Sequence, residues 1–282
     1  MPLVSMITTM KQAQAEGYAV PCFDTFEMLG TQGIFDALEG HDAPGIIGLY
    51  TRLMEEPHGR ALTAFVRTLA EDSAVPISIV LDHGASYEHC VRALSWGFTD
   101  VMYDGSRLPL EENIANTRRV VEAAHDAGAG VEAELGHVGS GKDYAREAGQ
   151  ALTDPAEAVR FVAETGVDTL AVAVGTAHGL YDGEPKLALD LLAAIRDRLD
   201  VPLVLHGGSG LSDGQYRDAI SRGIAKINIF TNLALKAGSR ARAAAQHPES
   251  SLHALTATIR EGFRVECERL LDVFGTTGQA SA

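Results

Sequence analysis

"SIVLDHGAS", residues 78–86, is an apolar run that ends on Asp82 and His83, with a glycine directly behind them. "PLVLHGGSG", residues 202–210, repeats the pattern and places His206 at the end of its run. Short apolar runs like these are typical of strands in a parallel sheet that is covered on both faces. Polar residues at two such ends indicate a site where the strands meet the following loops.

Eight apolar runs of this kind alternate along the chain with longer amphipathic, helical patterns. The runs are residues 18–23, 45–50, 77–81, 100–104, 130–135, 168–174, 202–206 and 225–230. Eight strand–helix units predict an α/β fold, the closed (β/α)₈ TIM barrel. An open doubly wound sheet is the alternative, but no glycine-rich dinucleotide-binding motif follows the first run.

Length and composition fit one domain of this kind. The chain has 282 residues, of which 46% are hydrophobic, enough for the core of a TIM barrel. We expect residues 1–275 to form the domain, with extra helices at 5–16 and 252–273 that close the barrel bottom or build an oligomer contact. Residues 276–282 are expected to form a flexible tail.

The net charge and the cysteine content restrict the expected binding partners and cellular location. The net charge of −15 disfavours binding to nucleic acid or to an anionic membrane. Three scattered cysteines without metal-site spacing fit a reducing cytoplasm better than a disulfide framework. The sequence has no secretory leader pattern and no apolar run long enough to span a bilayer. We therefore expect a cytoplasmic protein that binds a small molecule.

In a TIM barrel the polar residues at the strand ends would meet at one rim. These residues are Asp82, His83, Asp104, Glu132, Glu134, His178, His206 and Asn228. A single histidine at a strand end is usually an ordinary polar residue, but three beside glycines favour a Zn²⁺ site with one open position. The two glutamates would be costly inside the barrel unless they met a metal or a cation.

The two aspartates at the rim have other interpretations. Asp82 could cap a helix, but it precedes His83 rather than a helix, which favours a catalytic role. Asp104 could be a turn residue, because "YDGS" is a good turn sequence.

A second cluster follows the last two strands, where TIM barrels often bind phosphate. In "HGGSG", 206–210, Gly207 and Gly208 would let backbone N–H groups approach an oxyanion, and Ser209 adds a hydroxyl. Thr231 adds another after the last strand. Tight turns alone could explain the glycines, but their position favours a phosphate site.

These motifs together carry a resemblance. "LDHG", "GFTDVMYDGSRLPLEEN", "VEAELG", "DTLAVAVGTAHG", "PLVLHGGSG" and "AKINI" resemble the zinc-dependent class II ketose-bisphosphate aldolases, in particular the tagatose-/fructose-bisphosphate branch, over about residues 5–275. The resemblance implies Zn²⁺ on His83, His178 and His206, with Asp104 and Glu134 near the metal in an alternative position. It also implies a group around the phosphate and enediolate of a dihydroxyacetone-phosphate half: Gly179, Gly207, Gly208, Ser209, Asn228 and Thr231.

The resemblance further implies the reaction and a monovalent cation. A ketose phosphate would be cleaved reversibly to dihydroxyacetone phosphate and an aldehyde, with Zn²⁺ as Lewis acid and Asp82 moving the proton of the C4 hydroxyl. A monovalent cation, Na⁺ or K⁺, near the phosphate is usual in the family. We expect a homo-oligomer, a dimer or a tetramer.

Three departures from the family pattern concern the loops. Lys142 stands where the family has a glutamate that exchanges the proton of the enediolate, so the expected carboxylate is Asp143, with Glu147 near. After the first strand, Asp24 and Glu27 replace two amides. After the second, Arg52 and acidic neighbours replace small hydroxyl residues. Asp24, Arg52 and Lys142 are expected to bind the far half of a substrate that differs from fructose 1,6-bisphosphate.

The sequence favours two other functions less. A metal-dependent hydrolase on a barrel would show an H-x-H pair on its first strand, and this sequence has none. A non-catalytic sugar-phosphate-binding relative is favoured only by Lys142, whereas Asp82 beside three histidines favours an enzyme.

Overall fold

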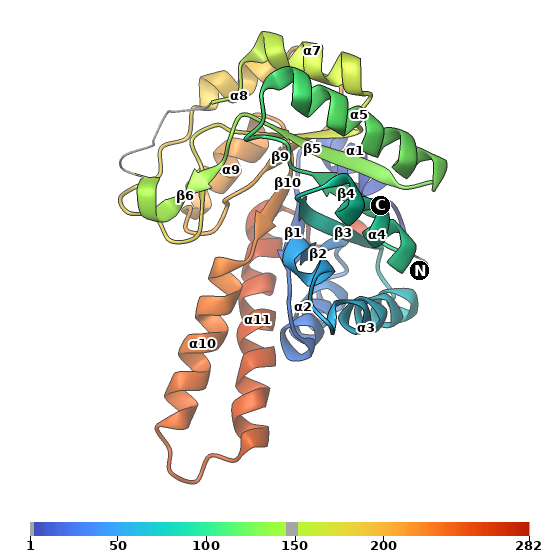
Figure 1. The fold of residues 1–282 in the computed structure, drawn as a ribbon. Coiled ribbons are helices and arrows are strands. Elements are labelled where there is room, and N and C mark those ends of the chain that lie inside the picture. Colours follow the sequence, from blue (N-terminus) through green and yellow to red (C-terminus); the bar gives the residue numbers. More distant parts are fainter. Residues whose placement is uncertain (1–2, 145–151, 282) are drawn as a thin grey trace.

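The computed structural model describes residues 3–144 and 152–281 of the chain. Within these residues eight parallel strands close into a barrel in the order β1-β10-β9-β7-β5-β4-β3-β2 (Figure 1). The strands are β1 Val20–Asp24, β2 Gly45–Tyr50, β3 Ile77–Gly84, β4 Asp100–Tyr103, β5 Gly130–Leu135, β7 Thr169–Val172, β9 Leu203–Leu205 and β10 Ile224–Ile229. Each coincides with one of the predicted apolar runs, so the predicted TIM barrel is confirmed.

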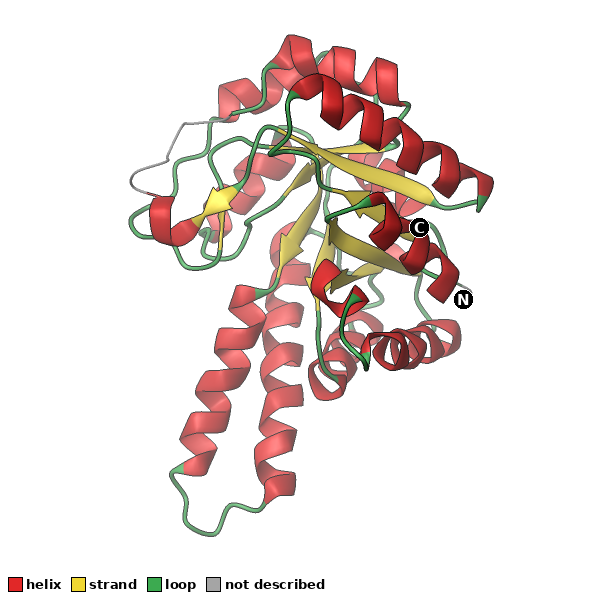
Figure 2. Ribbon diagram, viewed as in Figure 1, coloured by secondary structure: helices red, strands yellow, loops and turns green. Residues whose placement is uncertain are grey.

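Helices cover the outer face of the barrel (Figure 2). They are α2 Met28–Gly40, α3 Gly59–Asp72, α4 Tyr87–Trp96, α5 Leu110–Asp126, α7 Pro155–Thr165, α8 Leu189–Arg196 and α9 Asp213–Ser221. Helix α10 Thr231–Ala245 follows β10, and the short 3₁₀ helices η1 Thr51–Met54 and η2 Gly141–Asp143 lie in the loops after β2 and β5. Helix α7 shows why they start where they do. Asp154 accepts hydrogen bonds from the backbone of Ala156 and Glu157, a cap that stabilises a helix by about 1 kcal/mol.

Helix α1, Met6–Glu16, closes the bottom of the barrel, as the sequence predicts for residues 5–16. Met6 and Met10 are fully buried in the cluster that the inward-facing side chains of the strands form. Burying one such side chain contributes about 1.5–3 kcal/mol. Asp100 of β4 fastens the helix, because it accepts hydrogen bonds from Ser5 Oγ at 2.6 Å and from Met6 N at 2.8 Å.

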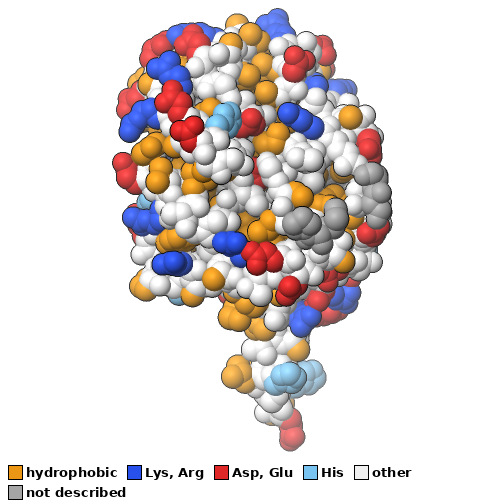
Figure 3. Space-filling model, turned by 90° about the vertical axis from the view of Figure 1, so that its right-hand side faces the viewer, with side chains coloured by type: hydrophobic (Ala, Val, Ile, Leu, Met, Phe, Trp, Pro, Cys, Tyr) orange, Lys and Arg blue, Asp and Glu red, His pale blue; other side chains and the backbone are white. Residues whose placement is uncertain are grey.

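Helix α11, Leu252–Phe274, packs against α2 and α10. Its approach to α2 requires a glycine, because a Cβ at Gly33 would lie 2.3 Å from the carbonyl oxygen of Arg260. Helices α10 and α11 form an arm that extends away from the barrel (Figure 1). Hydrophobic and histidine side chains lie near the end of the arm (Figure 3), where Leu252 is 77% exposed. Of the helices described, none is long and apolar enough to cross a membrane.

The residues after Phe274 differ from the expected flexible tail. Thr276 is fully buried, and its Oγ1 donates to the carbonyl of Ala19 at 2.7 Å. The backbone N–H of Gly278 donates to the carbonyl of His41, and a 3₁₀ helix, η3 Gln279–Ser281, follows. Hydrogen bonds to backbone carbonyls, which leave no trace in composition, hold residues 276–280 against the barrel.

A two-stranded parallel sheet lies outside the barrel and was not predicted. β6, Gly139–Ser140, pairs with β8, Ala177–His178. Strands of two residues are too short to produce an alternating pattern in a sequence. The pairing ties the loop after β5 to the loop that carries His178.

Candidate active site

A cavity of about 1040 Å³ opens at the carboxyl ends of the barrel strands. Side chains from successive strand ends line it: Asp24 of β1, Tyr50 of β2, Asp82 and His83 of β3, Tyr103 of β4, His178 of β8 and Asn228 of β10. His206, which follows β9, lines it as well. Six of the eight polar residues that the sequence predicts for one rim therefore line one cavity, whereas Glu132 and Glu134 are buried behind its lining.

Asp82 and His83 face the cavity together because β3 is irregular at its end. Consecutive residues of a regular strand point to opposite faces of the sheet. The register between β3 and β4 shifts between Leu81 and Gly84. His83 has a φ of 50°, in the left-handed region that side-chain-bearing residues seldom adopt. This local distortion lets two adjacent side chains serve one site, and strain of this kind is common at functional sites.

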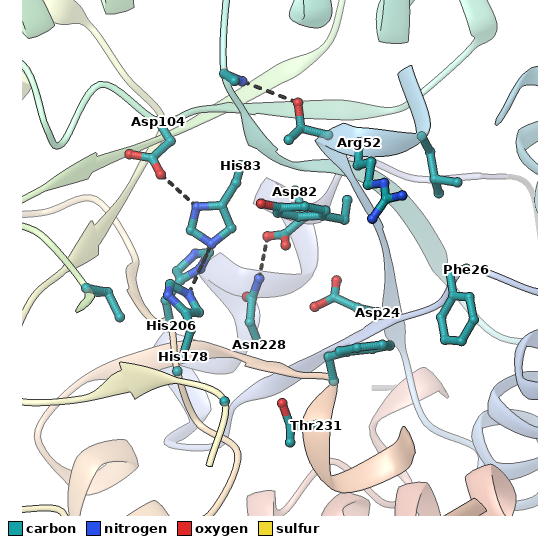
Figure 4. Close-up of a pocket in the computed structure, with 18 of the residues that line it drawn as sticks. Asp24, Phe26, Arg52, Asp82, His83, Asp104, His178, His206, Asn228 and Thr231 are labelled. Atoms are coloured by element: carbon teal, nitrogen blue, oxygen red, sulfur yellow. Dashed lines mark hydrogen bonds and ion pairs between the residues drawn. The ribbon is translucent and has the colours of Figure 1, made fainter. Parts of the chain in front are cut away.

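The three predicted imidazoles converge in the cavity (Figure 4). His83 Nε2 lies 3.2 Å from His178 Nε2 and 3.0 Å from His206 Nδ1. One ring nitrogen from each residue lies within 4.8 Å of the others. Three imidazole nitrogens around one point form the donor set of Zn²⁺ sites that keep a fourth position open.

Each ring also has a partner outside this centre. His83 Nδ1 lies 2.8 Å from Asp104 Oδ2, and His206 Nε2 lies 2.7 Å from Glu132 Oε1. His178 makes a hydrogen bond with the backbone of Val138. Metal-binding histidines are generally oriented in this way, by a carboxylate or a carbonyl at the second ring nitrogen. The residues present therefore fit a zinc ion.

The charges around the centre favour a cation there. Burial, and then the charge of His83, lower the pKa of His178 to about 3. Burial alone would lower the pKa of His83 too, but the charge of Asp82 and the hydrogen bond to Asp104 raise it to about 10. In the metal-free protein the positive charge that these carboxylates attract therefore resides on His83.

Asp104 and Glu134 lie on the other side of His83 and form a second potential metal group with it. Burial, and then the charge of Asp104, raise the pKa of Glu134 to about 8. Glu134 Oε2 is buried 3.8 Å from His83 Nδ1 and has no hydrogen-bond partner among the described residues. Asp104 Oδ1 accepts from Ser106 N at 3.0 Å, so Asp104 is both the turn residue and the partner of His83.

Glu132 forms an ion pair with Lys226, a residue that was not predicted to belong to the site. Its Oε2 lies 2.7 Å from Lys226 Nζ, and both side chains are buried in the barrel interior. Burial opposes ionisation, but the charge of Lys226 and the bond to His206 lower the pKa of Glu132 to about 2. A lysine in the apolar run "AKINIF" is the signal that could have identified it.

The predicted catalytic residue Asp82 is held by Asn228. Asn228 Nδ2 donates to Asp82 Oδ1 at 2.8 Å, and both side chains are buried (Figure 4). Within the part of the chain that the structure describes, Asn228 Oδ1 has no hydrogen-bond partner. The aspartate is thus oriented beside the histidine centre, and the amide keeps a free acceptor.

The glycine-rich loop after β9 lies at the edge of the cavity. Gly179, Gly207, Ser209 and Thr231 line the cavity, whereas Gly208 does not. A Cβ at Gly208 would lie 2.6 Å from the side chain of Ile227. Thr231 is the first residue of α10, so the N-terminus of a long helix is directed toward this edge, a favourable position for an anion.

Two of the loop residues predicted to bind the far half of the substrate line the cavity. Asp24 is buried, and burial followed by the charge of Asp82 raises its pKa well above the usual range. Arg52 is largely exposed and pairs with Glu56 at 3.2 Å. Glu27 does not line the cavity, because it caps α2 by accepting from Leu29 N and Gly30 N.

Three residues of the loop after β5 were predicted to belong to the site or to lie near it: Lys142, Asp143 and Glu147. Lys142 is exposed on η2 and is absent from the cavity lining. The backbone of Asp143 belongs to η2, but its side chain lies outside the described part of the chain. Glu147 lies outside the described residues altogether.

Other cavity residues were not predicted. Arg107 lines the cavity and, within the described residues, has no hydrogen-bond or ion-pair partner. Phe26 and Phe230 contact each other edge to face, with ring centroids 5.7 Å apart, and Tyr50 contacts His83 in the same way. Figure 4 shows Phe26 and Arg52 on the side of the cavity opposite the histidines. Single aromatic and arginine residues in loops carry no pattern that identifies them in a sequence.

Comparisons with known proteins cover almost the whole chain. Residues 4–279 match the family model "Fructose-bisphosphate aldolase class-II". A Bacillus subtilis (strain 168) protein, "Probable fructose-bisphosphate aldolase", is 39% identical over 285 residues, which cover 99% of this chain and 100% of the relative. A fructose-bisphosphate aldolase of Staphylococcus epidermidis is 42% identical over 239 residues, 82% of each chain.

A solved structure is similar over the same extent. The YdjI aldolase from Escherichia coli K12 superimposes with a TM-score of 0.90 at 33% identity, and the match covers 99% of each chain.

Proposed function

The chain belongs to the class II fructose-bisphosphate aldolase family and is a lyase, and we propose that it is a Zn²⁺-dependent aldolase that splits a ketose phosphate into dihydroxyacetone phosphate and an aldehyde. The observation that carries the proposal is the convergence of three imidazole nitrogens directly beside the oriented carboxylate of Asp82. A Lewis acid and a proton carrier in one cavity are what reversible cleavage of a C–C bond next to a ketone requires.

His83, His178 and His206 would hold the zinc ion. When bound, Zn²⁺ supplies Lewis-acid polarisation of the ketose oxygens. Asp104 and Glu134 would offer a second position for the ion, and the unpartnered Oε2 of Glu134 supports this assignment.

Asp82 is the proposed acid–base residue. During cleavage it would take the proton of the C4 hydroxyl as the C3–C4 bond breaks, and during condensation it would return a proton to the aldehyde oxygen. The hydrogen bond from Asn228 holds one oxygen of Asp82 and leaves the other for the substrate. Asp143 remains the proposed carboxylate for the proton on the ketone half, supported by its place in the loop that β6 ties to His178.

The dihydroxyacetone-phosphate half would lie against the loop after β9. Gly179, Gly207, Ser209, Asn228 and Thr231 line this part of the cavity, and Gly208 would contribute as backbone behind them. The N-terminus of α10 favours a phosphate here. A Na⁺ or K⁺ ion near that phosphate remains part of the proposal.

The far half of the substrate would carry an anionic group. Arg52 and Arg107 bring two guanidinium groups to the cavity of a protein whose net charge is −15, and guanidinium groups bind carboxylate and phosphate in bidentate fashion. The buried Asp24 would bind a substrate hydroxyl. Lys142, which does not line the cavity, is left with a role at its outer rim.

Assembly and location complete the proposal. The α10–α11 arm carries exposed leucines, Leu235 at 43% and Leu252 at 77%, which supports a homo-oligomer, a dimer or a tetramer. Cys22, Cys90 and Cys267 are free and buried, which supports a reducing, cytoplasmic location.

The experiment combines elemental analysis with a cleavage assay. Protein purified without added metal should hold about one equivalent of Zn²⁺, and it should release dihydroxyacetone phosphate from a panel of ketose 1-phosphates and bisphosphates. Binding of these sugars without cleavage, by a protein that holds zinc, would contradict the proposal and favour a non-catalytic relative.

A further inference from the structure

We propose that Lys226 is a positioning residue for the metal centre: through Glu132 it fixes the orientation and tautomer of His206, so that Nδ1 presents its lone pair to the ion. This inference rests on the proposed zinc site, but part of its test needs no metal. Neither Lys226 nor Glu132 touches the point where the imidazoles converge, so their effect would be transmitted through His206.

The three residues form a continuous chain inside the barrel. Lys226 Nζ lies 2.7 Å from Glu132 Oε2, and Glu132 Oε1 lies 2.7 Å from His206 Nε2. His206 Nδ1 lies 3.0 Å from His83 Nε2, at the centre. Strands β10 and β5, which carry Lys226 and Glu132, are separated in the barrel by β9 and β7, so the ion pair crosses the interior.

The geometry determines which nitrogen of His206 carries the proton. An ionised carboxylate can only accept hydrogen bonds, so at 2.7 Å from Glu132 the proton must be on Nε2. A neutral imidazole with its proton on Nε2 has its lone pair on Nδ1, the atom at the centre. Metal-binding histidines need this assignment because the metal takes the lone pair of the unprotonated nitrogen.

The buried carboxylate of Glu132 is in turn stabilised by the ammonium group of Lys226. The side chains of Glu132 and His206 are fully buried, and that of Lys226 is 1% exposed. By contrast, the side chain of Asp104, which orients His83, is 22% exposed. Glu132 has no solvent to satisfy its second oxygen, and an unpaired buried charge is strongly unfavourable. With Lys226 on Oε2, the carboxylate is fixed in the rotation that directs Oε1 at His206.

A buried ion pair could instead serve only to hold two strands together. The two roles differ in what they affect: a purely structural pair affects stability, whereas a positioning pair affects metal affinity and the tautomer of His206. Variants that remove the charge of the pair but differ in their hydrogen-bonding capacity separate the two.

Three variants make the comparison, with Lys236→Met on the exposed face of α10 as the control. Lys226→Met leaves Glu132 without its partner. Glu132→Gln/Lys226→Met removes both charges and keeps an acceptor oxygen for His206 Nε2–H. Glu132→Leu/Lys226→Met removes both charges and the acceptor. If the single variant does not fold, the two double variants decide, because neither contains an unpaired buried charge.

Two readouts apply to each variant. The first is the dissociation constant for Zn²⁺, measured on the metal-free protein by competition with a chelator. The second is the ¹⁵N chemical shifts of the His206 ring in the metal-free protein, which report the tautomer. We expect Lys226→Met and Glu132→Leu/Lys226→Met to bind zinc about 10–100-fold more weakly and to lose the Nε2–H tautomer. Glu132→Gln/Lys226→Met and the control should stay near wild type in both.

Two outcomes would overturn the inference. One is wild-type zinc affinity and tautomer in Lys226→Met, with only thermal stability reduced. The other is equal zinc affinity and an equal His206 tautomer in the two double variants, which would show that the hydrogen bond to His206 does not transmit the effect. Absence of zinc binding by the wild type would refute the proposed metal dependence instead, and the ring shifts would still decide whether Lys226 fixes His206.

Discussion

Asn228 Nδ2 donates a hydrogen bond to Asp82 Oδ1 over 2.8 Å, although 146 positions separate the two residues in the sequence. The contact joins the ends of β10 and β3 and orients the carboxylate beside the three histidines.

Replacing Asp82 by alanine should remove cleavage and spare the metal. A positioned acid–base group typically contributes about 10²–10⁴-fold, so kcat for cleavage should fall by that factor. Zinc content should stay at the wild-type level, and proton exchange on dihydroxyacetone phosphate should fall less than cleavage, because only cleavage needs Asp82. Equal losses in both assays, or loss of zinc, would make Asp82 a support of the metal site.

Removing one imidazole should remove the metal. His178→Ala should bind zinc at least about 100-fold more weakly, because a three-ligand site loses a ligand, and it should lose cleavage accordingly. His253→Ala, on the exposed start of α11, is the matched control and should keep both. Full zinc content and activity in His178→Ala would show that the ion binds elsewhere.

The stability of the metal-free protein should fall as the pH rises above neutrality. The pKa of His83 is raised from 6.5 to about 10, so the folded protein keeps a proton that the unfolded chain has released. This contribution is complete below pH 6.5 and is lost as the pH rises through about 10. Thermal unfolding of metal-free wild type and His83→Gln over this range should show a smaller fall in Tm for the variant. Parallel curves would contradict the assigned charge of His83.

The arginines should discriminate among aldehydes. Arg107→Ala and Arg52→Ala should raise KM for substrates whose aldehyde half is anionic by about 10-fold or more, because each variant removes a charged hydrogen-bond donor. The KM for a neutral aldehyde should change little in condensation. Lys236→Ala, on the exposed face of α10, is the control, because Lys236 does not line the cavity. If fructose 1,6-bisphosphate is cleaved efficiently and the arginine variants change nothing, the proposed far-end recognition is wrong.

Replacing Gly207 even by alanine should lower both the stability of the protein and its affinity for zinc. Its φ is 65°, and a Cβ would lie 2.5 Å from the carbonyl oxygen of Ala177, next to His178. Gly207→Ala should therefore destabilise the protein by about 1–3 kcal/mol through backbone strain and a clash, and also weaken zinc binding. Gly128→Ala, with a φ of 74° and no neighbour within 4 Å, isolates the strain alone. Equal loss of stability and of zinc affinity in the two variants would show that the close approach to Ala177 does not matter.

The barrel and most of its rim could be predicted from the sequence because both follow from local patterns. Apolar runs mark the strands, and the rule that barrel sites lie at the carboxyl ends of strands brings His83, His178 and His206 together. The irregular end of β3, which turns two neighbouring residues to one side, could not be predicted, because nothing in "LDHG" encodes a register shift.

The differences between the expected and the observed positions of other residues have physical causes of the same kind. Glu27 follows a strand, as a site residue would. Its side chain instead accepts hydrogen bonds from the otherwise unpaired N–H groups at the start of α2. Lys226 sits in a strand that reads as apolar, and only the three-dimensional pairing with Glu132 shows why a charge is tolerated there. Arg107 becomes notable only once the cavity is known.

The pairing of β1 with β10 means that the barrel is completed by its last strand. During synthesis on the ribosome, His83 and His178 emerge well before His206, and Lys226 and Asn228 later still. Thr276, which bonds to the carbonyl of Ala19 beside β1, emerges almost at the end of the chain. A nascent chain that lacks β10 therefore carries the three imidazoles but has no closed barrel around them. Pairing of β10 with β1 is thus the folding step that encloses the site.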